Sequence, residues 1–266
     1  DVEDLKSRLH MSVSSLESHM FDDDGCRRIL MRHFKVNTLI GLGVEEFPTG
    51  ILAAGALLQY LYDTQKTDLE HFTHISPYLT SKYMLLDSST RRNLELTETL
   101  REKQKRGSLL WVLDKTKTAM GGRLLRNYIE QPLIDKEEME KRLDAIQELN
   151  QDSISRDEIR EYLNPVYDLE RLLSKVTYKT ANPRDLIAFR NSLQMLPPIK
   201  TVLAGFQKEE LAAIREEIDG LEDIYQLIDE AIVEEPPISI REGGMIKDQF
   251  DETIDHLRAA KHDGKQ

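Results

Sequence analysis

The sequence predicts a mainly α-helical protein, in which a domain of long helices follows the C-terminal remnant of an α/β domain. Two sets of apolar residues recur at helical spacing, and each set lines one side of a helix. These sets are Met139, Leu143, Ile146 and Leu149, and Leu186, Phe189, Leu193 and Leu196. Strand patterns are few: a possible short strand at 83–86, and a possible hairpin at 238–246 that turns at Gly243 and Gly244.

The first 48 residues follow a different pattern from the rest of the chain. Carboxylates at 22–24 stand at the start of an amphipathic helix, where they can accept hydrogen bonds from free backbone amides. The apolar stretch 36–44 is short and interrupted by glycines, which predicts an exit strand or loop of an α/β unit. Pro48 and Gly50 interrupt any regular element before the next apolar run. We therefore expect two domains, residues 1–48 and residues 49–266.

Capping residues mark two helix starts in the second domain. Asp135 precedes a charged turn with two glutamates, so it is expected to cap a helix whose positive end attracts carboxylates. Asn182 followed by Pro183 is typical of an N-cap with proline at the first helical position. Pro197 and Pro198 lack a backbone N–H, so they should end or kink the helix that starts at Pro183.

The composition is that of a soluble globular chain, with 39% hydrophobic and 32% charged residues. No apolar run reaches the roughly 18 to 20 residues that cross a bilayer. The single cysteine, Cys26, excludes an internal disulfide and favours an intracellular compartment. Neither an initiator Met nor a signal peptide is present at Asp1, which is typical of a piece excised from a longer polypeptide.

Charge is unevenly distributed along the chain. The net charge of −12 argues against a general nucleic-acid binder. Residues 91–126 hold ten basic and four acidic residues, a local net of +6, whereas 207–266 hold seven basic and seventeen acidic residues, a local net of −10. Solvated helix faces are the commoner explanation of such runs, but the basic stretch could approach a phosphate backbone. Its candidate contacts lie in an expected loop and are Lys103, Lys105 and Arg106.

No pattern for catalysis or for a metal site stands out. A phosphate-binding loop reads G-x-x-x-x-G-K-[ST], and no segment matches it. His71 and His74 lie one helical turn apart without a third ligand nearby, which favours a solvated or core-edge pair. Cys26 has no recognisable nucleophile environment. We therefore expect no enzyme activity, no cofactor and no metal in this chain.

Gly121 and Gly122 lie just after two threonines and lack the third glycine of a dinucleotide-binding turn. Thr116 or Thr118 is expected to cap a helix there, because a hydroxyl can accept from the free amides of the first turn. The glycines would then let another backbone pass close to that helix. This segment is therefore predicted to be structural.

Trp111 is the only tryptophan and stands among leucines. A lone Trp in such surroundings usually buries its large apolar area, so core packing is expected. Stacking on a DNA base is the alternative, because Arg106 and Lys115 flank it in the sequence.

Five segments are distinctive: Asp87–Leu96, Ser108–Leu125, Gln131–Leu133, Asn182–Leu186 and Ile240–Gly244. In this order they resemble the MutS family of DNA mismatch-repair proteins, and the resemblance covers nearly the whole chain. The residues that carry this resemblance are Asp87, Thr90, Arg91, Asn93, Trp111, Thr116, Thr118, Gly121, Gly122, Arg123, Asn182, Pro183, Gly243 and Gly244. The stretch Asp63–Lys66 is more similar to bacterial members than to eukaryotic ones.

The resemblance implies that 1–48 are the end of the family's connector domain and that 49–266 are the first part of its core or lever domain. Residues 251–266 are similar to the lever helix that leads toward a DNA clamp. A lever of forty residues would span roughly 60 Å. The implied function is a structural lever and coupling region between the DNA-binding elements and a distant ATPase domain.

By the same resemblance, ATP and Mg²⁺ belong to the parent protein and not to this segment. The parent is expected to bind mismatched double-stranded DNA, to form a homodimer and to work with a MutL-type partner. It is expected to be cytoplasmic and nucleoid-associated, without a membrane partner. Two alternatives remain open: an all-α module that binds the DNA backbone, and a helical scaffold for protein interactions. Salt-sensitive DNA binding would favour the first and self-association would favour the second.

Overall fold

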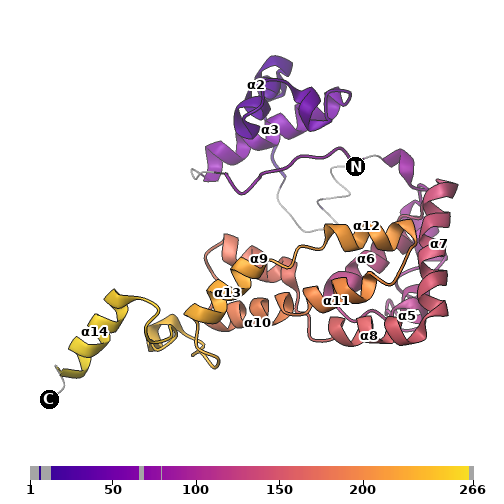
Figure 1. Cartoon of the computed structure of the whole chain (residues 1–266). Helices are drawn as coiled ribbons and strands as arrows, with labels where there is room; N and C mark the ends of the chain where they lie inside the picture. Colours follow the sequence, from indigo (N-terminus) through magenta and orange to yellow (C-terminus); the bar gives the residue numbers. More distant parts are fainter. Residues whose placement is uncertain (1–5, 7–12, 66–68, 79, 264–266) are drawn as a thin grey trace. The chain divides into compact units, whose positions relative to one another are not determined.

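The computed structural model of the chain describes residue 6 and residues 13–65, 69–78 and 80–263 (Figure 1). It divides into two compact units, Asp1–Leu79 and Thr80–Gln266. The described residues are mostly helical, and their β-structure consists of two isolated antiparallel bridges, Tyr83–Leu133 and Ile232–Ile246. The predicted mainly α fold is confirmed. The short strand expected at 83–86 is reduced to the first of these bridges.

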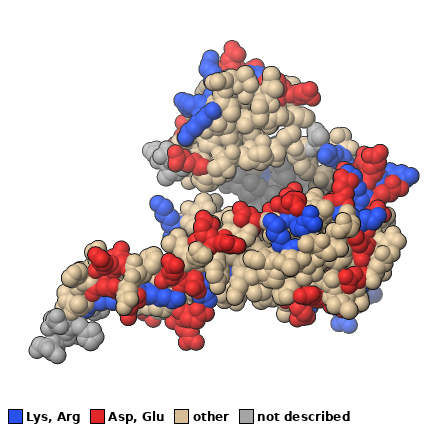
Figure 2. Space-filling model, viewed as in Figure 1, with Lys and Arg blue, Asp and Glu red and all other residues tan. Residues whose placement is uncertain are grey.

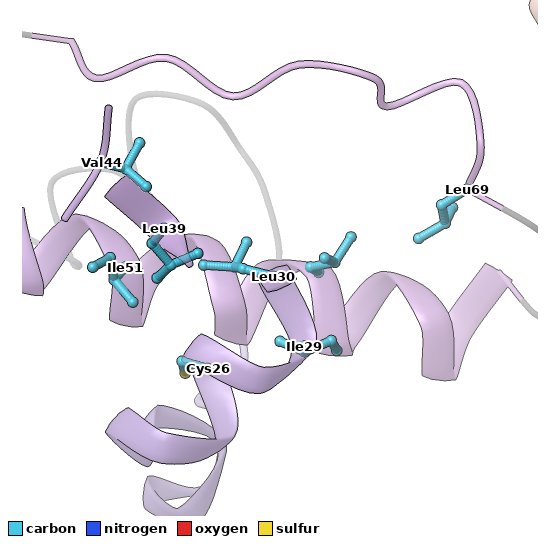
Figure 3. Close-up of a cluster of buried hydrophobic side chains, with 8 residues drawn as sticks. Cys26, Ile29, Leu30, Leu39, Val44, Ile51 and Leu69 are labelled. Atoms are coloured by element: carbon cyan, nitrogen blue, oxygen red, sulfur yellow. The ribbon is translucent and has the colours of Figure 1, made fainter. Parts of the chain in front are cut away.

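Unit 1 is a pair of packed helices with short connecting turns. Its elements are η1 (Ser18–Phe21), α2 (Asp23–Phe34), η2 (Leu39–Leu42) and α3 (Pro48–Gln65). The carboxylate of Asp22 caps α2 by accepting from the Gly25 amide at 2.8 Å, as the acidic triplet predicted. The helices enclose a cluster of apolar side chains, shown in Figure 3: Cys26, Ile29, Leu30, Leu39, Val44, Ile51, Leu58 and Leu69.

Helices α2 and α3 approach each other closely where Gly55 faces Cys26. A Cβ added at Gly55 would lie 2.4 Å from Cys26 Cβ and 2.6 Å from Cys26 Cα, so this contact has no room for a side chain. The Cys26 thiol donates to the carbonyls of Met20 and Leu52 at 3.3 and 3.5 Å. Burial, followed by the nearby carboxylates of Asp22 and Asp23, raises the pKa of this thiol.

Two expectations for the N-terminal region differ from the structure. The stretch 36–44 contains the 3-10 helix η2 where a strand or loop was expected. Pro48 begins helix α3 and does not separate two domains, because proline fits the first helical position. Ile51 and Leu58 of α3 pack into the same cluster as α2, so the division of the chain falls after Leu79.

Unit 2 is an all-helical assembly apart from its two bridges. Its elements are η3 (Thr80–Lys82), α4 (Ser88–Asn93), α5 (Leu109–Leu113), α6 (Ala119–Glu130), α7 (Lys136–Gln151), α8 (Ser153–Leu163), α9 (Leu169–Thr177), α10 (Pro183–Leu193), α11 (Leu196–Leu203), α12 (Glu209–Glu217), α13 (Glu222–Ala231), η4 (Ile240–Glu242) and α14 (Glu252–Asp263). Figure 1 shows α14 at the opposite end of this unit from α7 and α8.

Local capping chemistry determines several helix ends in unit 2. Asp135 caps α7 by accepting from the Glu138 amide at 3.0 Å. Asn182 caps α10 in a capping box with Asp185, and Pro183 is the first helical residue. Helix α10 ends at Leu193, and the two following prolines lie in the first turns of α11. These three expectations are confirmed.

In the described residues, unit 2 buries apolar side chains in three clusters. The first joins α5 and α6 through Leu96, Leu110 and Ile129. The second joins α7, α11 and α12 through Ala145, Ile199, Leu203, Phe206 and Leu211, and α8 packs against it through Ile159, Tyr162 and Leu163. The third joins α10 and α13 through Ile228, Ala231 and Ile232, with Leu186 and Phe189 against them. Unit 2 therefore consists of helix groups that are linked to one another and not wrapped around one core.

The two predicted apolar stripes have different outcomes. The stripe on α10 is confirmed for its first three residues, because Leu186 and Phe189 pack in the α10–α13 cluster and Leu193 is buried. Its fourth residue, Leu196, begins α11. The stripe on α7 is wrong for Leu143 and Ile146, which are 62% and 61% exposed. Its last residue, Leu149, does pack, together with Ala145 from a neighbouring face of the helix. Periodicity predicted the helix correctly but not the side that its neighbours cover.

The hairpin expected at 238–246 is also different in the structure. Gly243 and Gly244 have φ of +71° and +72°, as a glycine turn requires, but they follow the 3-10 helix η4. The antiparallel pairing lies outside this turn, between Ile232 and Ile246. Residues 234–244 therefore form a loop that leaves α13 and returns to its end.

No described helix has the length of a forty-residue lever. The longest, α3, has 18 residues, which is about 27 Å at 1.5 Å per residue. The length of unit 2 is therefore spanned by several linked helices and not by a single one. Residues 264–266 of the expected lever segment and Lys66 of the stretch Asp63–Lys66 lie outside the described residues.

Candidate functional site

The described residues contain no group of three His, Cys, Asp or Glu side chains that could hold a metal ion. His71 and His74 are exposed, and the His71 ring lies against Phe72 with centroids 4.2 Å apart. The candidate site is the loop that carries the three cations predicted to contact DNA.

Residues 97–107, here called the basic loop, are held in a defined shape by backbone hydrogen bonds. The amides of Leu109 and Leu110 donate to the carbonyls of Glu95 and Leu96 at 3.1 and 2.9 Å, which closes the base of the loop. Within it, the Thr99 amide donates to the Gln104 carbonyl at 3.0 Å. The loop thus presents its side chains from a fixed backbone.

The three predicted cations of the basic loop have different surroundings. Lys105 forms an ion pair with Asp114, which also accepts from the hydroxyl and the amide of Thr116 at 2.7 and 3.2 Å. Lys103 and Arg106 are exposed and form no ion pair with a described residue. The structure therefore leaves Lys103 and Arg106 available to an external anion. Lys105 instead connects the basic loop to Asp114, in the segment before α6.

The ion pair between Lys105 and Asp114 should depend on pH. The hydrogen bond from Lys105, and then those from Thr116, lower the pKa of Asp114 from 3.8 to about 2. A depressed carboxyl pKa contributes stability above the unfolded-state value, and this is lost as the pH falls from about 4 to 2. We expect the Asp114 carboxyl ¹³C shift to keep its ionised value at pH 3. A titration midpoint near 3.8 would contradict the contact.

The family-like residues Asp87, Thr90, Arg91 and Asn93 build helix α4. Asp87 caps it by accepting from the Thr90 amide at 2.6 Å, and the Arg91 guanidinium donates to the Leu86 carbonyl at 2.9 Å. Asn93 is the last helical residue. These contacts are local, so this motif shapes the chain just before the basic loop.

The second motif shapes the start of helix α6. Thr118 is the cap and accepts from the Gly121 amide at 3.0 Å, whereas Thr116 bonds Asp114. A Cβ added at Gly121 would lie 3.1 Å from Thr118 Oγ1, and one at Gly122 would lie 3.4 Å from Thr116 Oγ1. Threonine side chains, and not the expected second backbone, therefore occupy the space beside these glycines.

The expectation that Trp111 is buried is wrong. Its side chain is 48% exposed, and Leu109 and Leu113 are similarly exposed. Helix α5 has only five residues, so it turns little of its surface inward, and Leu110 occupies that position. The stability loss of a buried Trp is therefore not expected for Trp111→Ala.

Ion pairs between distant helices were not visible in the sequence. Arg123 of the α6 motif bonds both carboxylate oxygens of Asp168, at 2.8 and 2.7 Å. Arg190, whose side chain is only 7% exposed, pairs with Asp229 and Glu234. These partners lie 39 or more residues away in sequence, and no local pattern connects them.

Comparison with known proteins identifies the two units. A family model described as MutS domain III matches residues 89–263, which is more than half of the chain, and one described as MutS domain II matches residues 5–75. The chain belongs to the MutS family. The first matched range ends before Leu79 and the second begins after it, and the structure also divides at this residue.

Curated relatives are similar along the whole chain. The DNA mismatch repair protein MutS of Lachnoclostridium phytofermentans is 60% identical over 265 residues, covering 100% of this chain and 28% of the relative. The MutS protein of Ruminiclostridium cellulolyticum is 48% identical over 262 residues, covering 98% of this chain and 30% of the relative. The chain thus spans less than a third of the length of these MutS proteins. It holds domains II and III of the family and no ATPase domain.

The helices of the structure also bear on whether the chain could span a membrane. Among the residues that the structure describes, no helix is long and apolar enough to cross a bilayer.

Proposed function

We propose that this chain is a structural lever and coupling region of a MutS-type mismatch-repair protein. It would link the mismatch and clamp elements that bind DNA to an ATPase domain elsewhere in the parent. The parent would use ATP and Mg²⁺, bind mismatched double-stranded DNA, act as a homodimer and work with a MutL-type partner. The observation that carries the proposal is a continuous series of packed and hydrogen-bonded contacts from α10 to α14.

The first step of this series joins α10 to α13. The Arg190 guanidinium donates to both Glu234 oxygens at 2.8 and 2.7 Å, and to Asp229 at 2.8 Å. A guanidinium that bonds a carboxylate through two parallel N–H groups fixes relative orientation as well as distance. The same two helices also pack through the apolar α10–α13 cluster. The two helices therefore move as one body.

The second step joins α13 to α14. The Lys247 amide donates to the Ala231 carbonyl at 2.8 Å, and the Val233 amide donates to the Met245 carbonyl at 3.0 Å. Residues 245–248 are thus held against the end of α13. From α14, Arg258 donates to the Ile246 carbonyl and to Asp248. A rotation of α13 would therefore be passed on to α14.

The proposal is tested by lengthening this connection in a full-length MutS protein that carries the segment. Four Gly-Ser residues inserted between Asp248 and Gln249 would separate α14 from its support. We expect mismatch binding and basal ATP hydrolysis to persist, while stimulation of hydrolysis by mismatched DNA is lost. Unchanged stimulation would show that this connection does not couple the two activities.

The structure offers a matched control insertion. The same four residues between Gly243 and Gly244 lengthen the loop 234–244 at a point where an added Cβ meets no atom within 4 Å. The bonds that hold 245–248 to α13 remain. Stimulation should be preserved in this variant. If the control also lost it, the effect of the first insertion would come from general disruption and the proposal would fail.

A second candidate function, direct contact with the DNA backbone, is favoured by the exposed cations of the basic loop. Lys103 and Arg106 project from a hydrogen-bonded backbone, and Trp111 is exposed nearby in sequence. The acidic residues of 207–266, seen over α12–α14 in Figure 2, would repel phosphates. Binding by this chain alone should therefore be weak and indifferent to mismatches.

Neutralising Lys103 and Arg106 with glutamine should flatten the salt dependence of DNA binding by up to about two units of slope, about one for each phosphate contact. Lys105→Gln should change the slope little, because Lys105 already pairs with Asp114. Lys136→Gln, an exposed cation on α7, serves as the charge control. Titration of matched and mismatched duplexes at several salt concentrations measures this. An unchanged slope in the double variant would exclude the loop as the contact.

A further inference from the structure

Three linkers of the described chain join two groups of helices in unit 2, and together they are here called the waist. They connect α8 to α9, α10 to α11 and α12 to α13, and they are residues 164–168, 194–195 and 218–221. On one side of the waist lies the base, which is α7, α8, α11 and α12 with their own cluster. On the other side lies the arm, which is α9, α10, α13 and α14. Any lever motion of the arm must pass through this joint.

The waist is well packed and internally bonded. Leu193 and Ser192 at the end of α10 are fully buried, and Val166 of the first linker is also buried. The Ser192 hydroxyl accepts from the Tyr167 amide at 3.0 Å and donates to the Ala188 carbonyl at 2.8 Å. These contacts join the first linker to α10 and so keep base and arm together.

Arg123 reaches this joint from outside the base and the arm. It belongs to α6, which packs in the separate α5–α6 cluster and meets α7 where Arg142 covers the Tyr128 ring at 3.8 Å. The Arg123 guanidinium bonds both oxygens of Asp168 at 2.8 and 2.7 Å, and Glu170 at 2.6 Å. Asp168 is itself the N-cap of α9. The contact is therefore made at the point where the arm begins.

The geometry of this contact suits orientation better than stability. Arg123 and Glu170 are 47% and 70% exposed, and ion pairs exposed to that extent contribute little to folding. A guanidinium that forms a fork with one carboxylate and reaches a second nevertheless fixes the direction of both partners. A cation on α6 thus restrains the first turn of α9 without burying either helix.

We propose that Arg123 is a positioning residue, a strut from α6 that sets the angle of the arm at the waist. The inference rests on the proposed lever function and names the contact that sets the lever's resting orientation. Lysine would keep the charge but could not form the fork, so Arg123→Lys should restrain the arm only in part.

The test measures the distance between base and arm in the whole 266-residue chain. Nitroxide labels are attached at Q147C on α7 and Q226C on α13, both exposed positions, in a Cys26→Ala background that leaves no native thiol. Pulsed electron paramagnetic resonance then gives the distribution of distances between the two labels. In the Arg123→Ala variant this distribution should be about two-fold wider than in the unsubstituted chain, and in Arg123→Lys it should widen less. In about 1 M salt, which weakens solvent-exposed ion pairs, the distance distribution of the unsubstituted chain should broaden as well.

Arg126→Ala is the matched control. Arg126 lies on the same helix and is similarly exposed, but among the described residues it pairs with Glu130 alone, within α6. Its distance distribution should match that of the unsubstituted chain, and both variants should unfold at similar denaturant concentrations. A distribution for Arg123→Ala that superimposes on the unsubstituted one would overturn the strut. That result would leave the α13–α14 insertion experiment, and with it the lever proposal, unaffected.

Discussion

Gly55→Ala is expected to destabilise unit 1 by about 2 kcal/mol. The added Cβ would lie 2.6 Å from Cys26 Cα, a backbone atom that cannot rotate away, so α2 and α3 must separate. Overpacking of this kind costs about 3 kcal/mol, and the better helix propensity of alanine offsets about 1 kcal/mol. The expected net effect is large for a unit whose core consists of one cluster.

The two units carry separate native probes for this measurement. Cys26 is the only cysteine and lies in unit 1, while Trp111 is the only tryptophan and lies in unit 2. In Gly55→Ala, Cys26 should react faster with a thiol reagent, because burial and the raised pKa protect it in the native helix pair. The unfolding transition reported by Trp111 should not move.

Gly50→Ala is the control in the same helix. An added Cβ there meets only Phe47 Cβ, at 3.4 Å, which is close to an ordinary contact. This variant should be neutral or slightly stabilising. If Cys26 reacted with the thiol reagent at the same rate in Gly55→Ala and in Gly50→Ala, the close approach of α2 and α3 would be incorrect.

Arg190→Ala is expected to destabilise unit 2 by about 2 kcal/mol. The change removes a buried side chain and three charge-assisted hydrogen bonds between α10 and the end of α13. Loss of one partner of a fully buried pair costs about 3 to 5 kcal/mol. Asp229 and Glu234 are 43% and 70% exposed and can regain water, which lowers that figure.

Urea unfolding followed by circular dichroism measures this effect. Arg190→Lys keeps the charge without the fork and should recover part of the loss. Arg215→Ala removes an arginine that pairs with its own neighbour, Glu216, so it should stay within about 0.5 kcal/mol of the unsubstituted chain. Equal stability of the Arg190→Ala and Arg215→Ala variants would show that the buried network does not hold α10 to α13.

Features of the fold that have a local physical cause could be predicted from the sequence. The caps at Asp22, Asp135 and Asn182 could be predicted because a short polar side chain bonds an amide three residues away. The positive φ angles of Gly243 and Gly244 follow from the absence of a Cβ. The family followed from short segments whose order matched, and the comparisons confirm it.

Sequence reasoning failed where the outcome depends on neighbours that are distant in the chain. The apolar stripe of α7 was real, but α8 and α12 cover another face of that helix. Trp111 was expected in a core, yet a five-residue helix has one inward position and Leu110 fills it. Lys105 is a predicted DNA contact, but the fold brings it to Asp114, the residue that ends α5.

The most direct test of the lever is whether the arm, as one unit, changes its distance from the base when ligands bind. In a full-length MutS protein that carries this segment, labels at Q147C on α7 and A259C on α14 report the distance across the unit. The lever account predicts one narrow distribution in each state, with a mean that shifts when mismatched DNA and nucleotide bind. A broad distribution in all states, or a mean that ligands leave unchanged, would contradict it.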